Sequence, residues 1–206
     1  MKALSFLLLL VPAALAVALH PAALTRRAST EASCPTALHR ETGSAMTTTQ
    51  KAVPFLWFRR DAEAALEFYA SVFPDAEVGD ESRWGEGGPE PEGTLMGASI
   101  RFAGQRFMVL NGGPAPAFND SFSIFVHADT QPEIDDLWAK LTAGGGTPGP
   151  CGWLVDRFGV SWQVVPSRLL AMLTDEDAER VRRVGAALMQ MQKIDLARLE
   201  QAYTGR

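Results

Sequence analysis

Residues 52–73 read AVPFLWFRRDAEAALEFYASVF, and this stretch decides the fold. Its first seven residues, Ala52–Phe58, form a short apolar run rich in aromatic residues, which predicts a strand. Asp61 can cap a helix that begins directly afterwards. Apolar residues then recur at helical spacing, namely Ala65, Leu66, Tyr69, Val72 and Phe73. The stretch therefore predicts a strand followed at once by an amphipathic helix.

Three further strands are expected after this helix. One lies near Ala76–Trp84 and is followed by the flexible loop GEGGPEPEG (85–93). Thr94–Phe102 and Gln105–Asn111 form a hairpin across Ala103-Gly104. The first unit is therefore predicted to have the order β-α-β-β-β.

The same order recurs further along the chain. FSIFVH (122–127) predicts a strand, and Gln131–Ala143 predicts a helix. Placing Phe55 on Ile124 gives an offset of 124 − 55 = 69, which also carries Tyr69 onto Trp138 and Val72 onto Leu141. Two shorter strands, Gly152–Val155 and Val160–Val165, complete the second unit. An internal repeat of this kind predicts an α+β protein built from two tandem units.

The last forty or so residues are predicted to be helical. Thr174-Asp175-Glu176-Asp177 resembles a capping box, and Asp195 can cap a final short helix. Between them runs an apolar stripe that belongs to the core or to a dimer interface, comprising Ala178, Val181, Val184, Leu188 and Met191.

Composition narrows the functional classes. The 206 residues include 19 Lys plus Arg and 24 Asp plus Glu, so the formal net charge is 19 − 24 = −5. This acidic balance argues against general nucleic-acid binding, which needs a basic face. Two cysteines, Cys34 and Cys151, are too few for a disulfide scaffold, and nothing in the pattern decides whether they pair.

The N-terminus allows two interpretations. Lys2, an apolar run from Ala3 to Leu19 and the small residues Ala16-Val17-Ala18 fit a signal peptide, whereas Pro12 and the short length argue against a stable membrane span. Translation could instead begin at Met46. The protein would be secreted or periplasmic in the first case and cytoplasmic in the second. Residues 1–50 are thus predicted to be this N-terminal segment with a disordered spacer.

Several motifs, taken together, resemble one protein family. They are Pro54-Phe55-Leu56-Trp57-Phe58, Asn111-Gly112-Gly113-Pro114, Cys151 to Gly159 (CGWLVDRFG), Ser161 to Pro166 (SWQVVP) and Met189 to Asp195 (MQMQKID). With the tandem units, they resemble the PhnB-like branch of the vicinal-oxygen-chelate (glyoxalase and bleomycin-resistance) superfamily, often labelled 3-demethylubiquinone-9 3-methyltransferase-like. The resemblance implies a glyoxalase-like cup over residues 51–167, with units at 51–113 and 120–167, and a C-terminal helical extension at 168–206.

Metal-dependent members of that superfamily hold a divalent ion in the cup with His, Gln or Glu side chains. Here the resemblance places Pro54, Phe122 and Gln163 at three of those positions, and the fourth offers only Met108, Leu110 or Asn111. Proline and phenylalanine have no donor atom for a metal, and a neutral amide is a poor ligand. The sequence therefore predicts a protein without a metal or other cofactor.

The expected function is binding of a small, partly apolar molecule. Six residues are predicted to line its pocket, namely Leu56, Phe58, Asn111, Phe122, Trp153 and Gln163. By alternation, Trp57 and Trp162 should pack against the helices instead. A homodimer is expected, as the resemblance implies.

Two other functions remain open at this point. One is an enzyme, either a lyase, isomerase or dioxygenase with a weakly held metal, or a methyltransferase as the family label suggests. The other is a dimeric module without a ligand. The glycine runs Gly112-Gly113 and Gly144-Gly146 do not lie between a strand and a helix, so they do not predict a methyl-donor cradle.

Three residues with reactive side chains are predicted to have structural roles. His127 should bond locally at a strand end, and Asp156 should be the turn residue before Gly159. Cys151 has no cationic neighbour in sequence that would activate its thiol.

Overall fold

The computed structural model describes residues 50–114 and 117–206. The first module contains β1 (Phe55–Phe58), α3 (Ala62–Val72), β2 (Glu77–Arg83), β3 (Leu95–Phe102) and β4 (Gln105–Asn111). Its four strands form a sheet in the order β1-β4-β3-β2, in which β1 runs parallel to β4 and the other neighbours are antiparallel. This matches the predicted order of elements.

The second module repeats this connectivity. It contains β5 (Ile124–His127), α4 (Gln131–Thr142), β6 (Thr147–Pro148), β7 (Trp153–Val155) and β8 (Ser161–Val165). The sheet order is β5-β8-β7-β6, again with the first strand parallel to the last. The tandem β-α-β-β-β architecture is therefore confirmed, although the two-residue strand β6 was not predicted.

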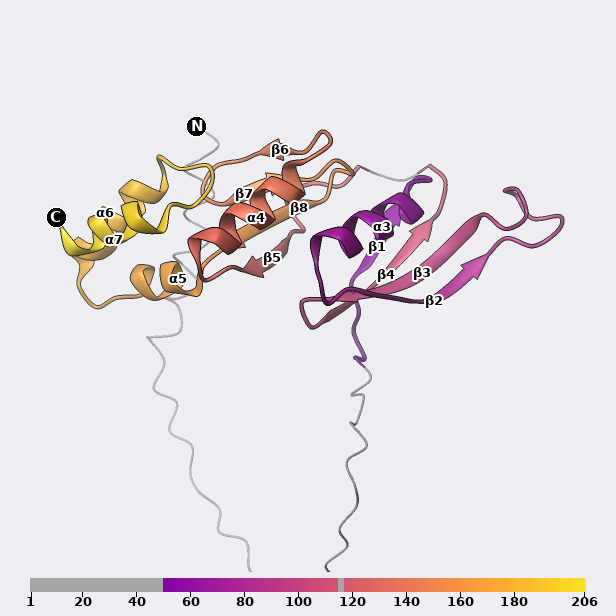
Figure 1. Cartoon of the computed structure of the whole chain (residues 1–206), viewed down its shortest axis with the longest axis horizontal. Coiled ribbons are helices and arrows are strands. Elements are labelled where there is room, and N and C mark those ends of the chain that lie inside the picture. Colours follow the sequence, from indigo (N-terminus) through magenta and orange to yellow (C-terminus); the bar gives the residue numbers. More distant parts are fainter. Residues whose placement is uncertain (1–49, 115–116) are drawn as a thin grey trace, which may run out of the picture.

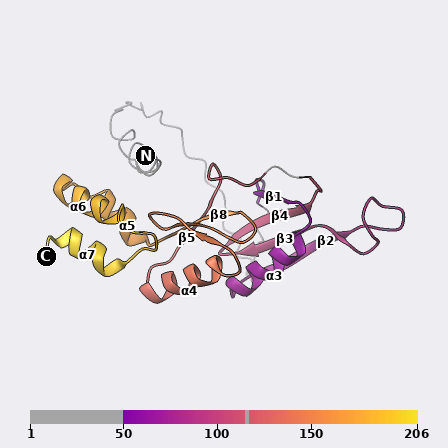
Figure 2. The same cartoon turned by 90° about the horizontal axis from the view of Figure 1, so that it is seen from above.

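Both modules contribute to one hydrophobic core. Helices α3 and α4 lie side by side and cover the same side of the two sheets (Figures 1 and 2). Trp162 on β8 is fully buried, and its ring centroid lies 5.6 Å from that of Tyr69 and 5.7 Å from that of Phe73, both from the first module. The prediction that Trp162 packs against the helices is correct.

A buried carboxylate joins the modules at the same place. Asp156 is 3% exposed, and its Oδ2 accepts hydrogen bonds from the Tyr69 hydroxyl and from Nε1 of Trp162, both at 2.9 Å. Its Oδ1 accepts the backbone N–H groups of Phe158 and Val160. Because four donors from both modules converge on one side chain, Asp156 fixes how the modules meet.

The C-terminal extension consists of α5 (Ser167–Leu173), α6 (Ala178–Leu188) and α7 (Leu196–Thr204), at the end of the molecule beside the second module (Figure 1). Asp177, not Thr174, is the N-cap of α6, and Asp195 caps α7 as predicted. The stripe residues Val184, Leu188 and Met191 are buried within the chain itself.

Two backbone hydrogen bonds attach this extension to the β6–β7 turn. The Cys151 N–H donates to the Met191 carbonyl at 2.8 Å, and the Gly152 N–H donates to the Gln192 carbonyl at 2.7 Å. The extension is therefore part of the folded unit and supports the edge of the second sheet.

The N-terminal predictions fall outside the described residues. These are the signal peptide, the alternative start at Met46 and the position of Cys34. Across residues 50–114 and 117–206, no helix is long and apolar enough to cross a bilayer.

Candidate ligand-binding site

Each sheet has one side that no helix of residues 50–114 and 117–206 covers (Figure 2), and we call this side the open face. On β1, Leu56 and Phe58 are buried towards α3, so alternation turns Phe55 and Trp57 to the open face. These two side chains are 56% and 41% exposed. The strand register places Met108 beside Phe55 and Leu110 beside Trp57. The β1 side of this open face is therefore apolar and aromatic, whereas the register brings Ser99, Arg101 and Arg106 to the same face further along β3 and β4.

The indole of Trp57 occupies the space that a side chain at position 112 would fill, which is available because residue 112 is glycine. A Cβ atom added at Gly112 would lie 2.1 Å from Nε1 of Trp57, which is far inside van der Waals contact. The indole therefore lies directly against the backbone of Gly112. A large aromatic ring that is both exposed and positioned in this way is suited to contact a ligand.

The open face of the second sheet mixes aromatic and polar groups. Gln163 on β8 lies between Phe125 on β5 and Trp153 on β7 in the strand register. Nε2 of Gln163 donates to Oγ of Ser123 at 2.8 Å, which orients the amide. Phe125 is 36% exposed, and its ring lies edge-on to that of His127 with centroids 5.1 Å apart.

The predicted side-chain directions on β1 are wrong. Leu56 and Phe58 are 1% and 3% exposed and face α3, whereas Trp57, which was expected under the helix, is on the open face. Asn111 also turns to the helix side, where its Oδ1 accepts the Ala62 N–H at 2.9 Å and its Nδ2 donates to the Leu95 carbonyl. Asn111 thus caps α3, a role that the sequence assigned to Asp61, whose side chain makes no cap hydrogen bond.

The remaining three predicted residues belong to the second module. Trp153 and Gln163 share its open face. Phe122 is 45% exposed and lies in the turn just before β5. That any of the six residues contacts a ligand stays a prediction. The sequence analysis did not include Phe55 and Phe125 among the pocket residues. Both fall on the open face once the alternation of each strand is counted from its buried residue, Leu56 on β1 and Ile124 on β5.

His127, Cys151 and Asp156 were predicted to have structural roles, and their surroundings agree with this. Nδ1 of His127 lies 3.2 Å from Oγ of Ser167, in agreement with a local bond. Burial raises the pKa of the half-buried Cys151 thiol, so it is a weak nucleophile. Asp156 is in the turn before Gly159, as predicted, and its side chain is buried. Burial raises the pKa of Asp156, although hydrogen bonds from Trp162 and Tyr69 oppose that shift.

The donor groups in the described residues do not fit a metal centre or a methyl-donor cradle. Within residues 50–114 and 117–206, no three His, Cys, Asp or Glu side chains come together in a group that could hold an ion. Gly112-Gly113 follows β4 and leads into a loop, and Gly144-Gly146 follows α4 and leads into β6. Neither run joins a strand to the start of a helix, as a nucleotide-type cradle requires.

The paired modules and their open faces define a protein of the glyoxalase-like (vicinal-oxygen-chelate) fold. A family model described as 3-demethylubiquinone-9 3-methyltransferase matches residues 50–165, which is more than half of the chain. The chain therefore belongs to this PhnB-like family. No curated protein matches it.

The chain is also similar to solved structures, the first of which supports this assignment. A PhnB protein from Bacillus cereus is 35% identical, with a TM-score of 0.52, and the match covers 57% of this chain and 100% of that one. Protein PA1353 from Pseudomonas aeruginosa is 23% identical, with a TM-score of 0.47, over 56% of this chain and 96% of that one. The fosfomycin resistance protein FosX from Listeria monocytogenes, with Mn(II) and a dihydroxypropylphosphonic acid, is 15% identical, with a TM-score of 0.44, over 57% and 92%.

Proposed function

We propose that this PhnB-like protein binds a small, partly apolar molecule on the open faces of its sheets, without a metal ion. The observation that carries the proposal is the exposed aromatic set on those faces, Phe55, Trp57 and Phe125. Exposed apolar patches of this kind mark binding surfaces, because leaving such area in water is unfavourable. The Gln163 amide, oriented by Ser123, adds a polar group that can orient the ligand.

The donor chemistry supports binding without a metal. The positions at which related cups carry metal ligands hold Pro54 and Phe122, neither of which has a side-chain donor atom. Gln163 offers an amide oxygen on the open face, with its nitrogen engaged by Ser123, whereas the oxygen of Asn111 already accepts the Ala62 N–H on the helix side. One neutral oxygen is too little to hold a divalent ion.

A homodimer is part of the proposal. The open faces of the two sheets lie side by side within one chain and not opposite each other (Figure 2). A second copy would cover the exposed rings and enclose a ligand that a single open sheet leaves in solvent. The apolar faces thereby provide both the subunit contact and the walls of the pocket.

The test is a thermal-shift and calorimetric screen of chelator-treated protein with small diols, quinones and aromatic antibiotics. At least one compound should raise the melting temperature, and light scattering should give the mass of a dimer. Trp57→Ala should weaken binding of that compound about tenfold, because a positioned Trp is the kind of residue that dominates binding energy. Trp138→Phe, on the helix side, is the matched aromatic control and should bind as the parent chain does.

Two results would contradict the proposal. Binding that appears only after a divalent ion is added would favour the metal-dependent enzyme. A panel in which nothing binds to the dimer would favour a module without a ligand.

A further inference from the structure

The side-chain amide of Gln163, in the middle of β8 on the open face of the second sheet, is only half engaged by the protein. Its Nε2 donates to Oγ of Ser123 at 2.8 Å, and this bond fixes the direction of the amide. Across residues 50–114 and 117–206, no group donates to its Oε1. In the same part of the chain, the one buried side-chain polar atom without a partner is Nε1 of Trp84, so Oε1 of Gln163 is accessible to solvent. The open face therefore presents an oriented acceptor.

Ser123 adds a donor beside this acceptor. Its hydroxyl oxygen accepts the bond from Gln163 and keeps its own proton, for which the described residues provide no acceptor. A hydroxyl group on a ligand can donate to Oε1 of Gln163 and accept from the Ser123 hydroxyl. An ether or carbonyl oxygen can only accept. The pair of side chains therefore matches a hydroxyl group better than it matches either of these.

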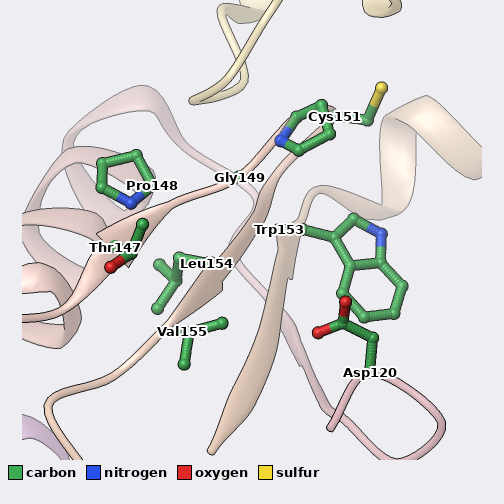
Figure 3. Close-up of a pocket in the computed structure, with 9 residues that line it drawn as sticks. Asp120, Thr147, Pro148, Gly149, Cys151, Trp153, Leu154 and Val155 are labelled. Atoms are coloured by element: carbon green, nitrogen blue, oxygen red, sulfur yellow. The ribbon is translucent and has the colours of Figure 1, made fainter. Parts of the chain in front are cut away.

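The strands on the two sides of β8 determine where the rest of the ligand lies. On β5, Phe125 is the neighbour of Gln163 in the register, and its ring is 36% exposed. On β7, the neighbour is Trp153, which lines a cavity of about 190 Å³ together with Asp120 (Figure 3). An exposed ring beside an oriented amide suits an aromatic ligand, because ring pairs in edge-on or offset contact are favourable. The ligand ring is therefore placed against Phe125.

We infer that Gln163 determines ligand specificity by selecting an aromatic molecule whose ring carries a hydroxyl group. Ser123 is the positioning residue for the amide, and Phe125 supports the ring. This inference rests on the proposed function and deepens it, because it names the chemical class of the ligand at the same open face. Phenols belong to that class, whereas quinones and aryl ethers, which have no donor, do not.

The test is an NMR titration of the full, chelator-treated chain with p-cresol and p-methylanisole, which differ only by a methyl group on the oxygen. The side-chain amide of Gln163 and the backbone amide of Phe125 report on the site. In the parent chain, p-cresol should bind about fivefold more tightly than p-methylanisole, because only p-cresol can donate to Oε1 of Gln163.

Three variants assign this preference to the amide. Gln163→Leu removes the acceptor and should reduce the preference to less than about twofold. Gln163→Glu keeps the shape and an acceptor oxygen, so it should retain the preference. Ser123→Ala frees the amide to rotate and should give an intermediate preference. The matched control is Gln201→Leu, which makes the same substitution at an exposed position of α7 and should leave the preference unchanged.

Equal affinity for the two probes in the parent chain, or tighter binding of p-methylanisole, would overturn the inference and leave ligand binding by the open faces intact. An unchanged preference in Gln163→Leu would overturn it as well. If neither probe shifts the Gln163 amide, the inference also fails, and the proposed function is still judged separately by the compound screen and Trp57→Ala.

Discussion

The two modules share one connectivity and differ in how their outer strands are supported. In the first module, β2 and β3 are seven and eight residues long and form an extended ribbon. In the second, β6 and β7 have only two and three residues, and their turn is bonded to the C-terminal extension. The first hairpin is thus stabilised by the hydrogen bonds between its own two strands. The second depends on Met191 and Gln192, which lie beyond the residues 50–165 that match the family model.

The difference shows which features a duplicated fold must keep. Both modules retain the parallel pairing of their first and last strands and the helix that covers one side of the sheet. Strand length and the residues on the open face have diverged. Substitutions on the open faces are therefore expected to change ligand binding, and substitutions in the shared core or at Asp156 are expected to change stability.

The junction should give the largest effect on stability. Asp156→Ala would leave four donors without an acceptor, and three of the hydrogen bonds lost are buried, including those from Tyr69 and Trp162. We expect the free energy of unfolding to fall by about 3–5 kcal/mol, measured by urea denaturation. Tyr69→Phe removes only the contribution of the first module and should cost about 1–2 kcal/mol. A negligible loss in Tyr69→Phe would show that Asp156 does not join the modules.

The same carboxylate predicts a pH dependence. Because burial raises the pKa of Asp156 in the folded state, the native protein binds more protons than the unfolded chain between the ordinary and the raised pKa. The free energy of unfolding contributed by this group should therefore fall as pH rises through that interval and stay constant above it. Asp156→Asn should lack this fall when denaturation is compared from acid to neutral pH. A parallel pH profile in the variant would contradict the assignment.

Two glycines test the different support of the hairpins. Gly104 (φ 74°) and Gly152 (φ 85°) occupy tight turns, each after a residue with positive φ. A Cβ at Gly104 meets nothing, whereas one at Gly152 would lie 2.9 Å from the Val164 carbonyl oxygen and 3.2 Å from Ile194 of the extension. Gly104→Ala should cost about 1 kcal/mol from backbone strain alone, and Gly152→Ala about 2 kcal/mol or more. Equal losses in thermal unfolding would mean that neither β8 nor the extension packs tightly against the turn of the second hairpin.

The smallest effect on stability is expected at Gly112. An added Cβ would displace the Trp57 indole, which is 41% exposed and can swing into solvent. The stability loss should stay below about 1 kcal/mol, while ligand affinity should fall as it does in Trp57→Ala. Unchanged affinity with a changed Trp57 environment by NMR would remove this ring from the site.

The arrangement of elements could be predicted because the helix patterns repeat faithfully. Buried Ala65, Phe68 and Val72 correspond to Ile134, Leu137 and Leu141 at the predicted offset of 69. The strand β6 could not be predicted, because two residues beside Gly149 carry no alternation.

The open face of the first sheet was missed for a related reason. The run Pro54 to Phe58 is apolar at every position, so it has no period-two signal. The buried residues of β1 and β5 correspond at an offset of 124 − 56 = 68, which is one less than the offset of 69 for the helices. A shift of one residue along a strand exchanges the side chains that face the helix with those on the open face. The Tyr69–Asp156 bond joins residues 87 positions apart and gives no local sequence signal.

The most direct test maps the ligand onto the protein by NMR, using chelator-treated chain and the compound from the screen that stabilises it most. The open-face account predicts shifts at Trp57, Phe125 and Gln163, with Leu56 and Phe58 unaffected. Shifts centred on Leu56 and Phe58, or shifts that appear only after a divalent metal is added, would contradict it.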